Sequence, residues 1–151
     1  MYKRQALSVS GAVFQGLFRN PLVSPGILGV GSGASFGATL AIFFAGNTAW
    51  AIGPSAFLWG LIAVFLAYHI GRRGGNSVTS LVLAGVIISA LFTAAVSFLK
   101  YKADPYNQLP AIVFWTMGSF NSAVWADTVR SSVLIATGLI CVYVLLSLIH
   151  I

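Results

Sequence analysis

Apolar segments and short polar breaks alternate along the chain, and every break contains glycine, proline or charged residues. Three of the apolar segments reach the roughly 20 residues that a helix needs to cross a bilayer. They lie at about residues 26–45, 50–71 and 77–99. Two shorter apolar segments flank them, at residues 6–18 and about 129–145. The pattern predicts an all-α integral membrane protein, a polytopic helical bundle with three complete spans.

The last break, residues 100–128, contains a further apolar run that is too short to span a membrane. We predict a short interfacial or re-entrant helix within residues 107–119, lying outside the main spans. Trp115 and Trp125 are expected at the depth of the lipid headgroups, where tryptophan is enriched.

The first break carries the strongest local signal in the chain, Arg19-Asn20-Pro21-Leu22-Val23-Ser24-Pro25-Gly26. Its two prolines end one helix, and its glycine allows the next helix to begin close by. Backbone groups freed by such a break cannot face lipid, because lipid offers them no hydrogen-bond partner. The break must therefore lie at a membrane face or line a protein cavity. We predict a helix stop that also acts as a hinge or gate, formed by Arg19, Asn20, Pro21, Pro25 and Gly26.

Glycines are spaced for close packing between helices. Gly29, Gly33 and Gly37 recur every four residues and are expected on one helix face, where another backbone can approach. Gly85 is expected to pack in the same way in the segment 77–99. Ile42 lies about 180° around the helix from Gly33, so we expect it away from this packed face and tolerant of leucine.

Composition supports the membrane class and excludes others. Apolar residues make up 58% of the chain and charged residues 7%, whereas a soluble domain carries about 25% charged residues. The single cysteine, Cys141, predicts neither a disulfide nor a metal cluster. The sequence also lacks a phosphate-binding glycine loop with lysine, a nucleophile elbow and a pair of catalytic carboxylates. We therefore expect no enzyme activity, cofactor, bound metal or nucleic-acid partner.

Charged residues give a weak orientation signal, with three cations on each side of the predicted spans. The pair Arg72-Arg73 lies in a short loop, where the positive-inside rule is most reliable. We therefore place this pair in the cytoplasm. His69 has no acidic or cysteine neighbour and is a poor metal ligand on its own. Asp104 and Asp127 are expected to be solvated loop or capping residues.

The two ends of the chain encode one DNA sequence in opposite orientations. Residues 1–5 fit the codons GTG TAT AAG AGA CAG, and residues 146–151 fit CTG TCT CTT ATA CAC ATC. The reverse complement of the second contains the first, and this DNA is the transposon end used to prepare sequencing libraries. We expect both ends to be sequencing-adapter scars around a native segment 6–145. Without Lys3 and Arg4, the formal charge falls from +6 to +4.

Four motifs, in order, are similar to those of one protein family. The run 10–18 precedes the pattern RNPL-x-x-PG-x-LG at 19–29, which continues as LGV-x-SGA at 28–34. Leu81–Val86 and Phe114–Ser119 follow, and Trp125 comes at the expected distance. The chain resembles the FecCD-type, or type II, ABC importer permeases, which take up iron-siderophores, haem and cobalamin.

The resemblance implies a subunit of about ten membrane helices, in which residues 6–145 form a partial permease domain covering helices two to six. It implies a multi-pass protein of the bacterial cytoplasmic membrane. It also implies contact with membrane lipid, an ATPase subunit, a periplasmic or lipoprotein substrate-binding protein and a second permease subunit. The residues expected to contact the substrate pathway or the periplasmic partner are Ser89, Trp115, Gly118 and Trp125. The motifs do not distinguish among the substrates of the family.

Two other functions are compatible with a short apolar chain. A small self-contained ion-coupled transporter would need an ionisable residue inside the membrane, and the only candidate is His69, at a helix end. An assembly protein could use the glycine-rich helix to oligomerise. A neighbouring ATPase gene and binding-protein gene would favour the importer over both.

Overall fold

In a computed structural model of the chain, the described residues are 2–21, 23–74, 77–118 and 125–150. Over these ranges the chain is helical and contains no strand, so the all-α prediction is confirmed. The helices fall into two compact units, Val23–Gly118 and the pair Met1–Leu22 with Ser119–Ile151.

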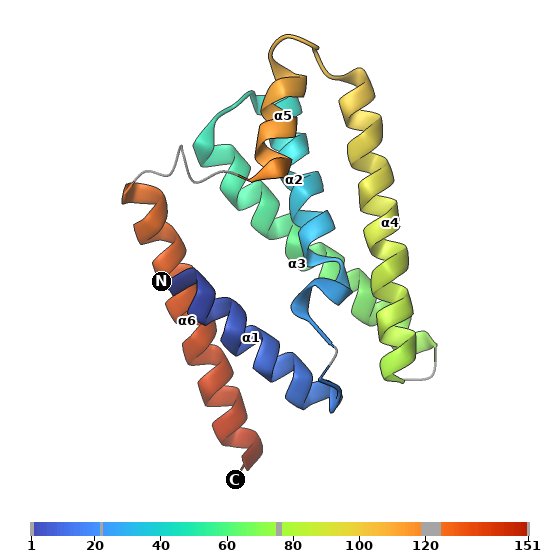
Figure 1. The fold of residues 1–151 in the computed structure, drawn as a ribbon, viewed down its shortest axis with the longest axis vertical. Helices are drawn as coiled ribbons and strands as arrows, with labels where there is room; N and C mark the ends of the chain where they lie inside the picture. The colour runs from blue at the N-terminus through green and yellow to red at the C-terminus, as the bar shows by residue number, and fades with distance from the viewer. Residues whose placement is uncertain (1, 22, 75–76, 119–124, 151) are drawn as a thin grey trace. The chain divides into compact units, whose positions relative to one another are not determined.

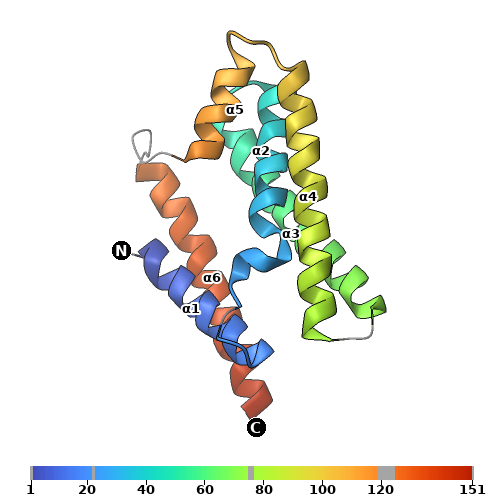
Figure 2. The same ribbon diagram turned by 45° about the vertical axis from the view of Figure 1, so that its right-hand side comes forward.

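The larger unit contains a 3-10 helix and four α-helices in its described residues (Figure 1). Within this unit α2 contacts both α3 and α4, and the two views show it running between them (Figures 1 and 2). The elements are η1 (Pro25–Leu28), α2 (Val30–Ala45), α3 (Ala49–Arg73), α4 (Val78–Lys102) and α5 (Gln108–Met117).

In the described part of the chain, α3 and α4 are the helices long and apolar enough to cross a membrane. Each has 25 residues, a length of about 37 Å, whereas the hydrocarbon core of a bilayer is about 30 Å thick. Large side chains on their outer faces are more than half exposed, among them Phe57, Phe65, Leu83 and Ile87. Such broad apolar faces are suited to contact with lipid or with further membrane helices.

The predicted span 26–45 is wrong as a single helix. Residues Pro25–Leu28 form η1, and α2 begins at Val30 and has 16 residues. Its length of about 24 Å is less than the roughly 30 Å of the hydrocarbon core. Gly29 separates the two helices with a φ of 78°, a left-handed conformation that a continuous right-handed helix excludes.

Pro54 interrupts the hydrogen-bond pattern of α3. Because α3 begins at Ala49, this proline lies inside the helix. Its missing N–H deprives the Trp50 carbonyl of its usual helical partner. The next residue, Ser55, donates a 2.7 Å hydrogen bond to the Gly37 carbonyl of α2.

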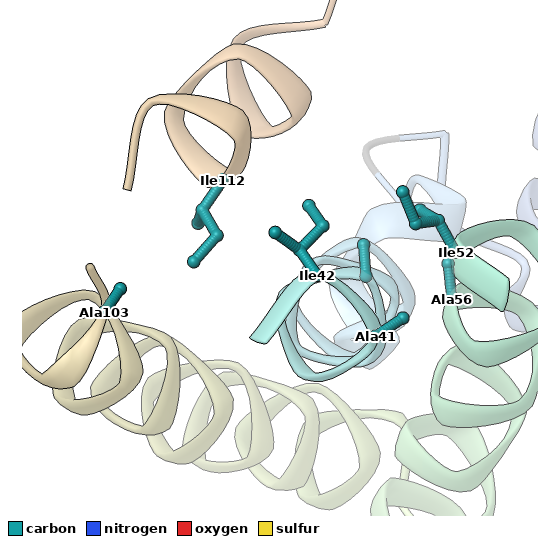
Figure 3. Close-up of a cluster of buried hydrophobic side chains, with 7 residues drawn as sticks. Ala41, Ile42, Ile52, Ala56, Ala103 and Ile112 are labelled. Atoms are coloured by element: carbon teal, nitrogen blue, oxygen red, sulfur yellow. The ribbon is translucent and has the colours of Figure 1, made fainter. Parts of the chain in front are cut away.

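The short helix predicted within residues 107–119 is present as α5. Its Ile112 points toward Ile42 of α2, and both side chains are fully buried, at 0% and 1% exposure (Figure 3). The same cluster contains Ala103 after α4 and Ile52 of α3. Ile42 was expected away from the face of Gly33, and its position there is buried because α5 covers that side of α2. Its tolerance of leucine stays a prediction.

The smaller unit contains α1 (Tyr2–Phe18) and α6 (Trp125–His150) in its described residues. Side chains of both helices line one shallow surface groove, among them Val9, Ser10, Ile135 and Val142. Gln15 lies in α1, and its side chain donates a 3.0 Å hydrogen bond to the carbonyl of Pro21, which follows the helix. The predicted segment 129–145 lies within α6, which is longer than expected.

Candidate functional site

Gly33 and Gly37 bring α2 and α3 into backbone contact. A methyl group on Gly33 would lie 2.6 Å from the Trp59 carbonyl oxygen, and one on Gly37 would meet the Ser55 carbonyl oxygen. The hydrogen bond from Ser55 to Gly37 crosses the same contact. We call this contact, formed by Gly33, Gly37, Ser55 and Trp59, the α2–α3 seam. A larger side chain at either glycine would force the two helices apart.

Gly29 was predicted on the same face, and the structure places it elsewhere. It precedes α2, and a methyl group on it would lie 3.0 Å from the Ser89 hydroxyl and 3.3 Å from the Gly85 carbonyl oxygen, both on α4. In return, a methyl group on Gly85 would collide with the Ile27 carbonyl oxygen of η1. Gly85 therefore allows the irregular backbone before α2 to lie directly against α4.

Three aromatic rings fix how α2, α3 and α4 pack on one another. Phe36 of α2 lies 4.8 Å from Trp59 of α3 and 5.3 Å from Phe92 of α4, measured between ring centroids. The rings of Trp59 and Phe92 are 6.0 Å apart. Separations of this size and the near-perpendicular Phe36–Trp59 pair are favourable aromatic geometries. The side of α2 that carries Phe36 is thus fixed to both neighbouring helices.

A groove of about 440 Å³ lies along another side of α2, and more of its lining surface is apolar than polar. We call it the polar groove for the hydroxyl and ammonium groups that line it. Most of its lining residues bear hydroxyl groups, Lys100 adds an ammonium group, and no acidic side chain is among them. Gly31 contributes open space, since a methyl group there would meet nothing within 4 Å. The lining consists of Gly31, Ser32 and Ser35 of α2, Thr93, Val96 and Lys100 of α4, and Thr116 of α5.

The side chain of Gln108 joins α5 to α2. Its amide nitrogen donates a 3.0 Å hydrogen bond to the Phe43 carbonyl near the end of α2. Its amide oxygen accepts one of 3.0 Å from the backbone N–H of Asp104. The Asp104 carboxylate accepts two hydrogen bonds of 2.9 Å from Asn107, one from the backbone and one from the side chain. Asp104 therefore stabilises the turn before α5 as a loop residue, and the N-cap position of α5 is occupied by Asn107.

The predicted hinge residues are divided between the two units. Arg19, Asn20 and Pro21 follow α1 in the smaller unit, and Arg19 has a left-handed φ of 48°. Pro25 and Gly26 begin η1 in the larger unit. The hinge or gate role of this break stays a prediction.

The predicted pathway or partner residues lie on α4, at α5 and on α6. Ser89 lies beside Gly29 on α4. On α5, Trp115 is exposed and Gly118 ends the helix with a φ of 74°. Trp125 is exposed at the start of α6, in the other unit. Their contact with a substrate or a partner stays a prediction.

Sequence reasoning missed the residues that line the polar groove. The available signal was the spacing of polar positions inside apolar segments. Ser32 and Ser35 are one helical turn apart, and Thr93 and Lys100 are two turns apart, so each pair shares a helix face. Only the packing of α2 against α4 shows that the two polar faces meet.

A sequence model described as the FecCD transport family matches residues 5–151. The chain belongs to the FecCD transport family. The membership that the four motifs suggested is thus confirmed, and family members are membrane permeases of ABC transporters, which places the chain in a membrane.

Several curated FecCD relatives are similar over most of the chain. The molybdate import system permease protein of Haemophilus influenzae is 49% identical over 123 residues, which are 79% of this chain and 35% of the relative. The cobalamin import system permease protein of Halobacterium salinarum is 36% identical over 88% of this chain and 36% of its own length. The hemin transport system permease protein of Yersinia pestis is 38% identical over 86% of this chain and 40% of its own length. The chain thus spans well under half of these relatives.

A solved structure shares the fold of this FecCD chain. It is an inward-facing conformation of a transporter assigned to the metal-chelate type of ABC transporter. The similarity has a TM-score of 0.81 at 43% sequence identity and covers 95% of this chain and 44% of the other. The predicted class, a helical bundle embedded in the membrane, is confirmed by this match.

Proposed function

We propose that the chain is part of the permease subunit of an ATP-driven importer, which moves an iron chelate (a siderophore complex or haem) or cobalamin across the bacterial cytoplasmic membrane. The observation that supports this most directly is the 43% identity over 95% of the chain to a transporter of the metal-chelate type. ATP hydrolysis belongs to a separate subunit in this proposal, and the permease supplies the pathway.

The polar groove is our candidate for a part of that pathway. Hydroxyl and ammonium groups are unfavourable against lipid, so within membrane proteins they face other protein groups or a water-filled cavity. Ser32, Thr93 and Lys100 lie on facing helices around one open space. A cargo with polar atoms could replace water there without leaving these groups unpaired.

We extend the proposed substrate range to molybdate. The molybdate permease of Haemophilus influenzae is 49% identical to this chain over the matched residues, and the cobalamin and hemin permeases are 36% and 38% identical. We therefore add a small oxyanion to the iron chelates and cobalamin as a candidate cargo.

The proposed partners follow from the importer architecture. They are an ATPase subunit, a substrate-binding protein on the periplasmic side or anchored as a lipoprotein, a second permease subunit and membrane lipid. We propose that Arg72-Arg73, at the exposed end of α3, faces the cytoplasm, because short cytoplasmic loops are rich in cations.

We also propose that residues 1–5 and 146–151 are adapter scars, which the codons of the source DNA would test.

Transport by the full-length permease tests the proposal. The permease is reconstituted in proteoliposomes with its ATPase and binding protein, and uptake of a ferric siderophore, haem, cobalamin and molybdate is measured. We expect uptake of at least one cargo that requires ATP and stops when the ATPase subunit is omitted. Uptake that persists without the ATPase and follows a proton gradient would instead support a self-contained ion-coupled transporter.

A further inference from the structure

The two lysines at the end of α4 differ in their surroundings. Lys100 is partly buried and lines the polar groove, whereas Lys102 is exposed and is not among the lining residues. A separation of two residues is a rotation of about 200° around a helix. The side chains of Lys100 and Lys102 therefore leave α4 in nearly opposite directions. Lys100 therefore brings a positive charge to the groove that Lys102 does not.

Lys100 adds three donors to a groove whose hydroxyl groups can also accept hydrogen bonds. Thr93 donates its hydroxyl proton to the Ser89 carbonyl at 2.7 Å, and Thr116 donates to the Ile112 carbonyl at 2.9 Å. Among the described lining residues, Ser32, Ser35 and Lys100 remain to donate outward. A lysine ammonium group carries three donors and no acceptor, so the groove favours a ligand rich in acceptor oxygens.

The helix ends around the groove contribute partial charges of both signs. Gly31 and Ser32 belong to the first turn of α2, where the backbone N–H groups carry partial positive charge, whereas Lys100 lies in the last turn of α4, where the carbonyl groups carry partial negative charge. The acid nearest in sequence, Asp104, already accepts two hydrogen bonds from Asn107. No carboxylate among the described lining residues offsets the charge of Lys100.

We propose that the polar groove selects a negatively charged, oxygen-rich cargo and that Lys100 is the residue that determines this specificity. The proposal rests on the function proposed above and narrows it, because molybdate and anionic ferric chelates fit this chemistry and an uncharged corrinoid does not. The hydroxyl groups of Ser32 and Ser35 orient the oxygens of the cargo, and the lysine supplies the charge.

Cysteine chemistry measures the charge of the groove without transport. In the full-length permease with Cys141→Ser and its other cysteines replaced, Ser35→Cys is treated with an anionic methanethiosulfonate and with a cationic one. The ratio of the two rates is compared with that of a free thiol. We expect Lys100→Gln to lower this ratio about tenfold, which corresponds to about 1.4 kcal/mol.

Two matched variants control this measurement. Lys102→Gln removes the same charge from the exposed side of α4 and is expected to leave the rate ratio unchanged. Lys100→Arg keeps the charge and is expected to restore the ratio. Equal ratios for Lys100→Gln and Lys102→Gln would overturn the proposal, whether or not the permease transports.

Uptake then distinguishes the possible cargoes. With the complete importer, molybdate, an anionic ferric siderophore and uncharged cyanocobalamin are offered separately. We expect uptake of one of the two anions, with a KM about tenfold higher in Lys100→Gln and unchanged in Lys102→Gln. Efficient uptake of cyanocobalamin alone would overturn the proposal and leave the importer function intact. Failure of the wild-type complex to take up any of these three cargoes or haem would overturn both.

Discussion

Two sides of α2 use the same residue type for opposite purposes. A methyl group on Gly33 would lie 2.6 Å from the Trp59 carbonyl oxygen, whereas one on Gly31, two residues earlier, would meet nothing within 4 Å. The first glycine closes the α2–α3 seam, and the second leaves the polar groove open. The comparison teaches that glycine spacing by itself does not identify a packing face, because an empty side of a helix can carry glycine too.

The two sides of α2 also differ in the interactions that connect them to the neighbouring helices. The seam combines backbone contact with the hydrogen bond from Ser55, and the ring of Phe36 packs on both neighbouring helices. The groove is an open space between side chains of α2, α4 and α5. A helix fixed on one side and free on the other can present its polar side to a cargo without losing its position.

The largest expected effect comes from filling the seam. Gly33→Leu in the full-length permease should destabilise it by about 3 kcal/mol, the upper end of the range for overpacking, because the Trp59 carbonyl leaves no space. Gly31→Leu serves as the matched control and should retain near wild-type amounts of folded protein. Fluorescence-detected size-exclusion chromatography of solubilised membranes measures both. Similar losses for the two variants would show that the two sides of α2 do not differ.

Gln108→Leu tests the connection between α5 and α2. The change leaves the Phe43 carbonyl and the Asp104 N–H without their partner, and unpaired groups of this kind cost about 1–3 kcal/mol. We expect a lower Tm for the purified permease in detergent. Thr116→Val, at the other end of α5, removes hydrogen bonds within one helix and should shift Tm less. A larger shift for Thr116→Val would contradict this assignment.

Gly31→Ala should stabilise the protein slightly. Alanine favours a helix over glycine by about 1 kcal/mol, and the groove side has space for its methyl group. Gly33→Ala gains the same helix preference and meets the Trp59 carbonyl, so its net effect should be destabilising. Opposite signs of the change in Tm are the expected result, and equal signs would argue against the difference between the sides.

The smallest effect is expected for Ser55→Ala, which removes the hydrogen bond across the seam. Interhelical hydrogen bonds in membrane proteins contribute about 0.6 kcal/mol on average. We expect a loss of this size, smaller than that of Gly33→Leu. A loss as large as that of Gly33→Leu would mean that the hydrogen bond, more than backbone contact, holds the seam.

The sequence was sufficient for features that depend on long local patterns. The helices α3 and α4 follow from uninterrupted apolar runs, and α5 follows from a short run between polar residues. The four motifs were sufficient for family membership. A motif records what family members share, so it could not distinguish among their cargoes.

Features that depend on partners distant in sequence were not predictable in this way. Gly29 fitted the spacing of a helix face, yet it ends η1 with a left-handed φ of 78° and lies against Gly85 and Ser89 of α4. Ile42 is buried because Ile112 packs on it from α5. Lys100 lines the groove because of how α4 packs on α2. The pattern of a single apolar segment does not contain that information.

The contact between Gly85 and η1 also concerns the position of the break between η1 and α2. Backbone that leaves the helical pattern loses its own hydrogen-bond partners, and lipid cannot replace them. Along α4, the absent side chain at Gly85 makes a notch that admits the Ile27 carbonyl. The notch keeps this irregular backbone out of contact with lipid. The position of the break before α2 therefore depends on the absence of a side chain at Gly85 of α4.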